Sequence, residues 1–380
     1  MSLVRVVGSG LVMVLCFPFV GCGEDCPIGG PLPKAKPIDI QAGQEHTCVL
    51  RTDRKLSCWG RNDLEQIDVL GADHLEMSVL DASRVKQFST QSHHVCVVTD
   101  SRSVSCWGYN ETGQVGSGAA SAHEPPTIVP GLEDVLEVRA GGHHTCARRA
   151  QEVLCWGDNR TGAVGDGTFE ERLVPTRVLE PTEPARLALG RTFTCSVSKS
   201  GAVECWGTGA AGQLGIGTRE ARNTPVVVQG LPAVKSLELG LDHACALVAD
   251  GSVYCWGKNN DGQTGQALLE DQLSPVVVQG LGATRQLFSG HDHTCAIGAD
   301  DVTRCWGRNE FGQLGDGTRE NRATPVPVQG LGRATRLALG DDHSCALMDD
   351  LEVYCWGRNQ YGQLGDATRV DRLVPAPVKR

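Results

Sequence analysis

The residues most able to do chemistry in this 380-residue chain are its cysteines, because most of them stand in regularly spaced pairs. Cysteine pairs can hold a metal ion, exchange disulfides or form structural crosslinks. Fourteen of the 17 cysteines form seven pairs with a separation of ten positions, except in the third pair, where the separation is nine. The pairs are Cys48 and Cys58, Cys96 and Cys106, Cys146 and Cys155, Cys195 and Cys205, Cys245 and Cys255, Cys295 and Cys305, and Cys345 and Cys355.

The spacing favours structural disulfides over a metal site. Zinc sites use closely spaced pairs such as C-x2-C, and a separation of ten does not fit that pattern. In the last copy, Asp349, Asp350 and Leu351 lie midway between two stretches of alternating apolar residues, which is typical of a β-hairpin. Residues facing each other in an antiparallel pair have Cα atoms ~4.5–5.5 Å apart, which a disulfide can span. We therefore expect one disulfide within each hairpin, with bridges between neighbouring repeats as the alternative.

These pairs belong to a larger repeat that must position them. Cys-Trp-Gly recurs seven times at intervals of 48 to 50 residues. Each copy contains three or four short stretches of period-two alternation separated by glycine- and proline-rich loops, and none shows a helical period. Such repeats are typical of β-propeller blades. We predict an all-β fold in which residues 38–380 form a single seven-bladed propeller. The last strand could complete blade seven or join blade one.

The repeat also resembles a known family. The pattern G-x-x-H-x-C-A-L…V-Y-C-W-G-x-N-x-x-G-Q-L-G-x-G-T…P-x-x-V, clearest over residues 307–328, is similar to the regulator-of-chromosome-condensation repeat. The resemblance implies a seven-bladed propeller. It also implies, for some members, chromatin binding and nucleotide exchange on a small GTPase through a basic tail and specific loops. The paired cysteines are an addition to the family pattern.

The N-terminus indicates a destination outside the cytoplasm. Residues 1–21 combine Arg5 with an apolar run and predict a signal peptide. The segment from Phe19 to Cys22 resembles a bacterial lipobox, so we expect Cys22 to be lipidated, with an ordinary signal cleaved nearby as the alternative. Residues 22–37 read as a flexible Gly/Pro-rich tether. Cys26 is the one cysteine left after the seven pairs, Cys22 and Cys16 of the signal peptide are assigned; it either forms a disulfide with a partner or stays free. The expected location is a bacterial membrane surface, the outer membrane in a diderm, or the secreted fraction.

Composition and motifs exclude several classes of function. The net charge is −10 and no stripe of lysine and arginine appears, which argues against nucleic-acid binding. This absence and the signal sequence both oppose an exchange-factor activity. The sequence lacks G-x-S-x-G, H-E-x-x-H and G-x-x-x-x-G-K-[ST] motifs. We therefore predict no catalytic residues, no metal and no cofactor.

Two further repeated residue types favour structural roles. A histidine precedes the first cysteine by two positions in six copies, and Phe193 replaces it in copy four; these histidines are His46, His94, His144, His243, His293 and His343. We expect each imidazole to hydrogen-bond within its own blade rather than bind metal. The tryptophans are expected to pack between blades, where each removes ~150–250 Å² from water; they are Trp59, Trp107, Trp156, Trp206, Trp256, Trp306 and Trp356.

Function is then expected where the repeats differ. In copy one, Glu65 and Asp68 replace two glycines and should reshape that loop, and copy five carries Leu268 and Leu269 in the corresponding region. These are weak candidate binding loops, because decay of a tolerant repeat explains them equally well. We predict a monomeric, non-enzymatic lipoprotein that binds a protein, peptide or glycan. The alternatives are an exchange factor or an enzyme that uses a propeller face.

Overall fold

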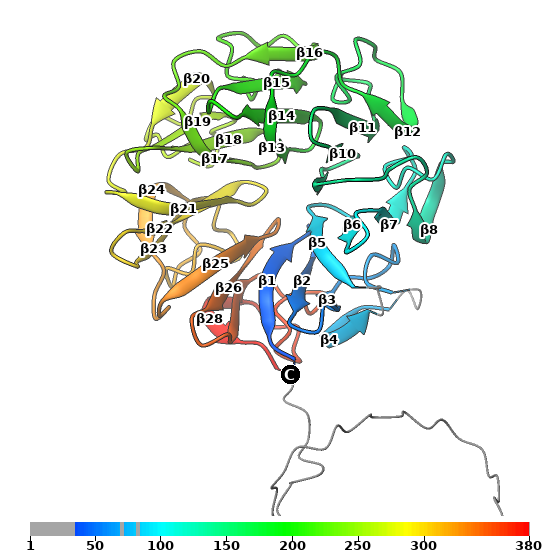
Figure 1. Cartoon of the computed structure of the whole chain (residues 1–380). Coiled ribbons are helices and arrows are strands. Elements are labelled where there is room, and N and C mark those ends of the chain that lie inside the picture. The colour runs from blue at the N-terminus through cyan, green and yellow to red at the C-terminus, as the bar shows by residue number, and fades with distance from the viewer. Residues whose placement is uncertain (1–34, 69–71, 81–83, 380) are drawn as a thin grey trace, which may run out of the picture. The chain divides into compact units, whose positions relative to one another are not determined.

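Seven antiparallel sheets of four strands surround a central axis in chain order (Figure 1). The computed structural model describes residues 35–68, 72–80 and 84–379. The predicted signal peptide, the predicted lipidation site Cys22, Cys26 and nearly all of the tether lie outside these residues. Within the described part, no helix is long and apolar enough to cross a membrane.

Each sheet is one blade built from one continuous segment. Blade one comprises β1 (Pro37–Ala42), β2 (His46–Arg51), β3 (Leu56–Gly60) and β4 (His74–Leu80). Blade two comprises β5 (Val85–Thr90), β6 (His94–Thr99), β7 (Val104–Asn110) and β8 (Ser121–Ile128). Blade three comprises β9 (Glu137–Ala140), β10 (His144–Arg148), β11 (Val153–Gly157) and β12 (Arg172–Arg177). Blade four comprises β13 (Pro184–Leu189), β14 (Phe193–Ser198), β15 (Val203–Gly207) and β16 (Arg222–Val227).

The remaining blades repeat the same order. Blade five comprises β17 (Val234–Leu239), β18 (His243–Val248), β19 (Val253–Gly257) and β20 (Gln272–Val277). Blade six comprises β21 (Thr284–Ser289), β22 (His293–Gly298), β23 (Thr303–Gly307) and β24 (Arg322–Pro327). Blade seven comprises β25 (Ala334–Leu339), β26 (His343–Met348), β27 (Val353–Gly357) and β28 (Arg372–Pro377). The all-β, seven-bladed prediction is confirmed.

The ring closes without exchange of a strand. The last strand, β28, pairs with β27 and so completes blade seven, while β1 to β4 form all of blade one. Side chains hold the closing interface. Arg336 of β25 forms a 2.6 Å ion pair with Asp39 of β1, and the indole Nε1 of Trp59 donates to the main-chain oxygen of Gln363 at 2.9 Å. Of the two predicted alternatives, the last strand completes blade seven, and the ring closes by packing of blade seven against blade one.

All seven cysteine pairs are disulfides within hairpins. Each joins directly opposed residues of the second and third strands, for example Cys345 and Cys355, with Cα atoms 4.1 Å apart. In blade three the separation is nine, and Cys146 still faces Cys155 because the hairpin loop is one residue shorter. The predicted connectivity is confirmed, and bridges between blades do not occur among these fourteen cysteines.

Breaking one of these crosslinks should have a bounded cost. We expect Cys345→Ser with Cys355→Ser to lower the free energy of unfolding by ~2–3 kcal/mol, because the chain-entropy model assigns about that much to a closed loop of ten residues. Chemical denaturation of the oxidised protein measures the change. A loss of more than about twice this value would show that the bond also fixes the hairpin register.

The tryptophans and histidines join neighbouring blades. Each indole is buried and donates to a main-chain oxygen of the preceding blade, as Trp156 does to Gln114 at 2.9 Å. The histidines reach the following blade: His94 Nε2 lies 2.8 Å from Thr145 Oγ1. The expectation of a bond within the same blade was wrong, because the ring points along the blade interface and finds its partner across it.

The tautomer of these histidines follows from their partners. Thr145 Oγ1 donates to the main-chain oxygen of Gln114 at 2.7 Å, so its oxygen must accept from His94, whose Nε2 carries the proton. The exception in blade four fits the same scheme. Phe193 has no donor, and the next blade has Ala244 where five blades have a hydroxyl, so the donor and its acceptor are absent together. Blade two has Val95 at this position, and Thr90 takes the place of the missing hydroxyl as the partner of His46 at 2.9 Å.

Candidate functional site

The ring has two distinct ends at which a ligand could bind. The turns between first and second strands, such as residues 43–45, lie at one end, which we call the A end. The loops between third and fourth strands also begin there. The hairpin turns between second and third strands, such as residues 52–55, lie at the opposite B end. Because β1 runs from the B end to the A end, equivalent first strands line the axis in parallel.

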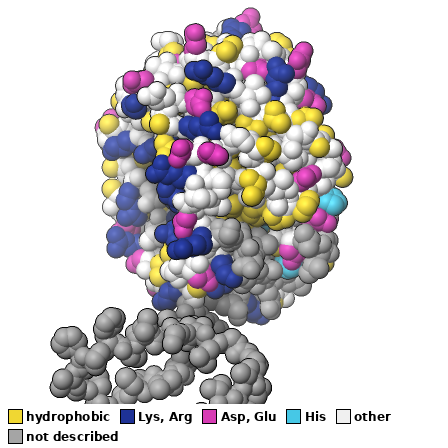
Figure 2. Space-filling model, turned by 45° about the vertical axis from the view of Figure 1, so that its right-hand side comes forward, with side chains coloured by type: hydrophobic (Ala, Val, Ile, Leu, Met, Phe, Trp, Pro, Cys, Tyr) yellow, Lys and Arg dark blue, Asp and Glu magenta, His cyan; other side chains and the backbone are white. Residues whose placement is uncertain are grey.

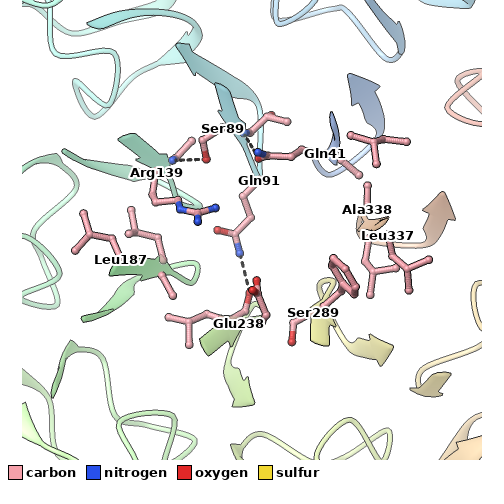
Figure 3. Close-up of a pocket in the computed structure, with 18 of the residues that line it drawn as sticks. Gln41, Ser89, Gln91, Arg139, Leu187, Glu238, Ser289, Leu337 and Ala338 are labelled. Carbon is pink, nitrogen blue, oxygen red and sulfur yellow. Dashed lines mark hydrogen bonds between the residues drawn. The ribbon is translucent and has the colours of Figure 1, made fainter. Parts of the chain in front are cut away.

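A narrow channel along the axis holds alternating polar and apolar side chains. A cavity of about 140 Å³ is lined by the first strands of all seven blades. In Figure 3, Arg139 and Glu238 lie on different sides of this space, and Gln91 extends across it. Gln91 Nε2 donates to the main-chain oxygen of Leu239 at 3.3 Å, which joins blade two to blade five across the axis. The side chain of Gln91 therefore obstructs the channel.

Gln91 is exceptional among the seven repeats. The other six blades have glycine at this position, because the following histidine or phenylalanine packs on its Cα; a Cβ on Gly43 would lie 2.1 Å from Cε1 of His46. Main-chain hydrogen bonds link successive turns around the axis, such as Arg191 N to Leu241 O at 3.2 Å. Among the described residues no such bond joins the turns of blades two and three. The crossing side chain of Gln91 originates beside this gap.

Above Gln91 the A end opens into a cavity of about 440 Å³, which we call the axial pocket. One side of its wall is aromatic and basic. Tyr109 lies edge-on between His93 and His143, with ring centres 6.4 and 6.3 Å away, and Arg191 stands beside them. Burial lowers the pKa of His93 to about 4, with a further contribution from Arg61. His93 is therefore neutral at physiological pH.

The opposite side of the axial pocket is acidic. His291 Nδ1 lies 3.4 Å from Asp292, and its Nε2 lies 3.8 Å from Asp341. Burial alone would lower the pKa of His291, but the hydrogen bond to Asp292 and the charge of Asp341 outweigh burial and raise it. Burial raises the pKa of Asp341 to about 7, against the opposing effect of His291. The pocket thus presents a wall whose charge changes near neutral pH.

This titration has a measurable consequence for stability. The folded protein holds a proton on Asp341 up to about pH 7, whereas an unfolded aspartate loses it near pH 3.8. The free energy of unfolding therefore falls as pH rises from about 3.8 to about 7, and this loss persists above pH 7. We expect Asp341→Asn to raise the free energy of unfolding most above pH 7 and not at all near pH 4. Denaturation of both proteins across this pH range measures the difference. An effect independent of pH would contradict the assignment.

The sequence-predicted binding loops lie at the A end but away from the axial pocket. Leu268 and Leu269 are 75% and 53% exposed on the loop between β19 and β20. Glu65 keeps the left-handed backbone that glycine adopts in the other blades, with φ 55° against 76° at Gly113, so the expected reshaping is wrong there. Asp68 does differ, since its carboxylate lies 2.9 Å from Nε2 of His74.

Sequence reasoning missed the residues that form the axial pocket. Most of them lie between the glycine and the histidine of G-x-x-H, where the two middle positions vary widely. The first middle position lines the pocket in every blade, and the second does so only as His93 and His143; the first-position residues are Gln44, Ser92, Gly142, Arg191, Leu241, His291 and Asp341. Variation confined to two positions of an otherwise regular motif was the available signal. Among the residues that the structure describes, no group of three or more His, Cys, Asp or Glu side chains could hold a metal ion.

Solved structures with the same architecture share little sequence with this chain. Human WBSCR16 is 22% identical with a TM-score of 0.74, covering 81% of this chain and 86% of its own. Yeast RCC1 (Prp20), solved bound to Kap60, is 19% identical with a TM-score of 0.76, covering 95% and 91%. The ectodomain of the Arabidopsis thaliana receptor kinase ACR4 is 20% identical with a TM-score of 0.53, covering 91% and 98%. No curated protein is significantly similar in sequence.

Family models match most of the propeller. The RCC1-like domain matches residues 133–380, and the regulator of chromosome condensation (RCC1) repeat matches residues 38–66 and 103–148. These matches, the repeat pattern and the seven four-stranded blades agree with one another. The chain belongs to the RCC1-like domain family.

Proposed function

We propose that this protein is a non-enzymatic, extracytoplasmic lipoprotein whose propeller binds a protein or peptide partner at the axial pocket. One observation supports the axial pocket as the binding site. The repeats keep the residues that build the blades and vary at the positions that converge on the pocket. A scaffold under selection for a partner is expected to vary in this way, because its core must stay constant while its contact surface becomes specific.

The pocket has the chemistry of a protein-binding surface. Tyr109 offers a large flat contact area with a polar end, and Arg191 offers a charged hydrogen-bonding group; both residue types are enriched where binding energy concentrates. Asp341 on the opposite wall supplies the other sign of charge above about pH 7. Gln91 blocks the channel below, so a partner side chain entering the pocket would meet a floor.

The covalent chemistry of the propeller supports the proposed location. Disulfides persist in oxidising compartments and are rare in the cytosol, and each of the seven blades has one. The signal-like residues 1–21 and the lipobox-like segment ending at Cys22 point to the same compartment. The ectodomain of a plant receptor kinase has a similar fold, so such propellers also occur outside the cytoplasm.

A family-derived alternative is nucleotide exchange on a small GTPase. Prp20p from Saccharomyces cerevisiae, which has a similar fold, binds Gsp1p and histones. A small GTPase partner for this chain would require a reducing compartment, where seven disulfides are not expected to persist. The scaffold reading is therefore the better supported of the two.

Metabolic labelling tests the anchor. We expect radioactive palmitate to label the protein in the source organism and the Cys22→Ala variant to remain unlabelled. Equal labelling of the two forms would show that Cys22 is not the lipidated residue.

Cross-linked capture from intact cells tests the binding site. A membrane-impermeant cross-linker should recover one partner with the wild-type protein and lose it with Tyr109→Ala/Arg191→Ala. The matched control is Leu268→Ala/Leu269→Ala, which alters the exposed loop at the same end of the ring. Loss of the partner with the control and retention with the pocket variant would assign binding to the loop instead.

A further inference from the structure

A second, larger cavity lies at the B end, opposite the axial pocket. It is open to solvent, has a volume of about 640 Å³ and is lined by five cationic side chains from blades four to seven: Arg186, Lys199, Lys235, Arg285 and Arg336. We call it the basic cavity. Four of these residues come from the first strands β13, β17, β21 and β25, and Lys199 comes from the hairpin turn of blade four. In the sequence they are spread over 151 positions, so no basic run reveals them.

Several of these cations are held in place by main-chain oxygens. Arg186 Nη1 donates to the main-chain oxygen of Lys235, and Lys235 Nζ donates to that of Ala249 at 2.9 Å. Such bonds orient a cationic side chain without pairing its charge. Glu238 acts on the charge of Arg186, and Asp250 acts on that of Lys235, from beyond ion-pair distance. Among the described residues, no carboxylate lies within ion-pair distance of Arg186, Lys199 or Lys235.

The two remaining cations of the basic cavity, Arg285 and Arg336, each form an ion pair with an aspartate. Arg285 pairs with Asp301 at 2.8 Å, and Arg336 pairs with Asp39 at 2.6 Å. Glu238 is the one carboxylate among the residues that line the basic cavity. Three cations therefore face this carboxylate without an ion-pair partner of their own.

The concentration of positive charge contrasts with the rest of the protein, whose net charge is −10. Figure 2 shows that charged side chains are unevenly distributed over the visible face, where Lys and Arg, with some Asp and Glu among them, lie mainly to one side of an area of hydrophobic side chains. A cavity lined by cations attracts anions, because walls of low dielectric constant concentrate the field.

We propose that the basic cavity is a binding site for a phosphate-bearing ligand. The planar guanidinium of Arg186 can donate two parallel hydrogen bonds to phosphate oxygens, and the ammonium groups of Lys199 and Lys235 supply compact charges around them. The volume exceeds that of a single phosphate ion and leaves room for the group that bears it. A lipid headgroup and a soluble phosphate ester share this chemistry.

The described chain both enters and leaves the ring at the B end. Pro37, the first residue of β1, pairs with Arg51 near the B end, and Pro377 of β28 pairs with Tyr354 on the same side of its disulfide. Both ends of the propeller chain therefore lie at the end of the ring that holds the basic cavity.

Calorimetric titration with inorganic pyrophosphate tests the site in the full-length chain. We expect saturable binding that weakens as salt is added, and at least about tenfold weaker binding by Arg186→Gln/Lys199→Gln/Lys235→Gln. The matched control is Arg219→Gln/Arg319→Gln/Arg369→Gln, which removes three charges from the loops of the A end. An absence of saturable binding, or an equal loss with the control, would overturn the proposal.

Vesicle sedimentation distinguishes the two sources of phosphate. The Cys22→Ala chain is used, so that an acyl group cannot insert into the bilayer. Binding to vesicles of phosphatidylglycerol and phosphatidylcholine, but not of phosphatidylcholine alone, identifies a lipid headgroup. Pyrophosphate binding without vesicle binding identifies a soluble phosphate ester. Both results support the site even if palmitate labelling fails, and loss of pyrophosphate binding overturns it even if labelling succeeds.

Discussion

Acidification is expected to destabilise the propeller well before its carboxylates reach their ordinary pKa values. Burial lowers the pKa of six interface histidines from 6.5 to about 3 or about 4. Unfolded histidines titrate near 6.5. Between about pH 6.5 and about pH 4 the unfolded chain therefore binds protons that the folded chain does not, and the free energy of unfolding falls as pH falls. Each histidine contributes up to ~1.4 kcal/mol per pH unit.

A single substitution isolates this effect from other titrations. Buried acids such as Glu238 and Asp341 have raised pKa values, so protonation relieves their cost and partly offsets the histidines as pH falls. His343→Gln keeps an N–H donor for Thr47 and removes the titrating ring, which lies 2.8 Å from that hydroxyl. As pH falls, we expect the free energy of unfolding of His343→Gln to fall less steeply than that of the wild type. The two slopes should differ by up to ~1.4 kcal/mol per pH unit. Parallel pH profiles would contradict the neutral, buried imidazole.

Truncation of an interface tryptophan is expected to have the largest effect of any single neutral substitution. Trp356 is fully buried, and its Nε1 donates to Gln313 O at 2.8 Å. We expect Trp356→Ala to lower the free energy of unfolding by ~3–5 kcal/mol, because it creates a cavity between two blades. Trp356→Phe should cost about 1 kcal/mol for the lost hydrogen bond, in addition to the smaller cavity. Denaturant unfolding measures both.

The same substitution at Trp59 tests how the ring closes. Trp59 makes the equivalent contact across the interface of blades one and seven, with Gln363 O at 2.9 Å. Because closure uses the same side-chain contacts as the other interfaces, Trp59→Ala should cost as much as Trp356→Ala. A much smaller loss at Trp59 would mean that the closing interface is weaker than the rest.

The features that follow from one repeat could be predicted from the sequence. The separation of Cys345 and Cys355 and the intervening turn sufficed to place a disulfide, because both are local to one hairpin. Blade count and strand order followed from the period in the same way. The shorter hairpin of blade three was visible as a separation of nine between Cys146 and Cys155.

Features that depend on how repeats meet could not be predicted. The histidine partners lie about fifty residues away in the next blade, as Thr145 does for His94, and no local pattern indicates that direction. The crossing of Gln91 to blade five depends on the diameter of the ring. The basic cavity combines residues as distant as Arg186 and Arg336, whose charges are unremarkable within their own repeats.

Two departures from the repeat, at Phe193 and Ala244, are visible in the sequence, but the sequence does not show that they are linked. Phe193 replaces a histidine and Ala244 replaces a hydroxyl, and only the interface of blades four and five shows that they belong together. Glu65 is the opposite case. It looked like a change of loop conformation, yet it adopts the left-handed backbone of the glycine it replaces. Such a residue costs ~1–3 kcal/mol in local strain, which the rest of the loop must offset.

Site-specific photocross-linking in intact cells tests the central claim most directly, namely that a partner binds in the axial pocket. A photoreactive phenylalanine derivative at Tyr109 would place the reactive group in the pocket, and the same residue at Val302 would place it on an exposed hairpin at the B end. We predict a discrete protein adduct from position 109 that is lost with Arg191→Ala, and none from position 302. An adduct from position 302 with none from position 109 would contradict the account.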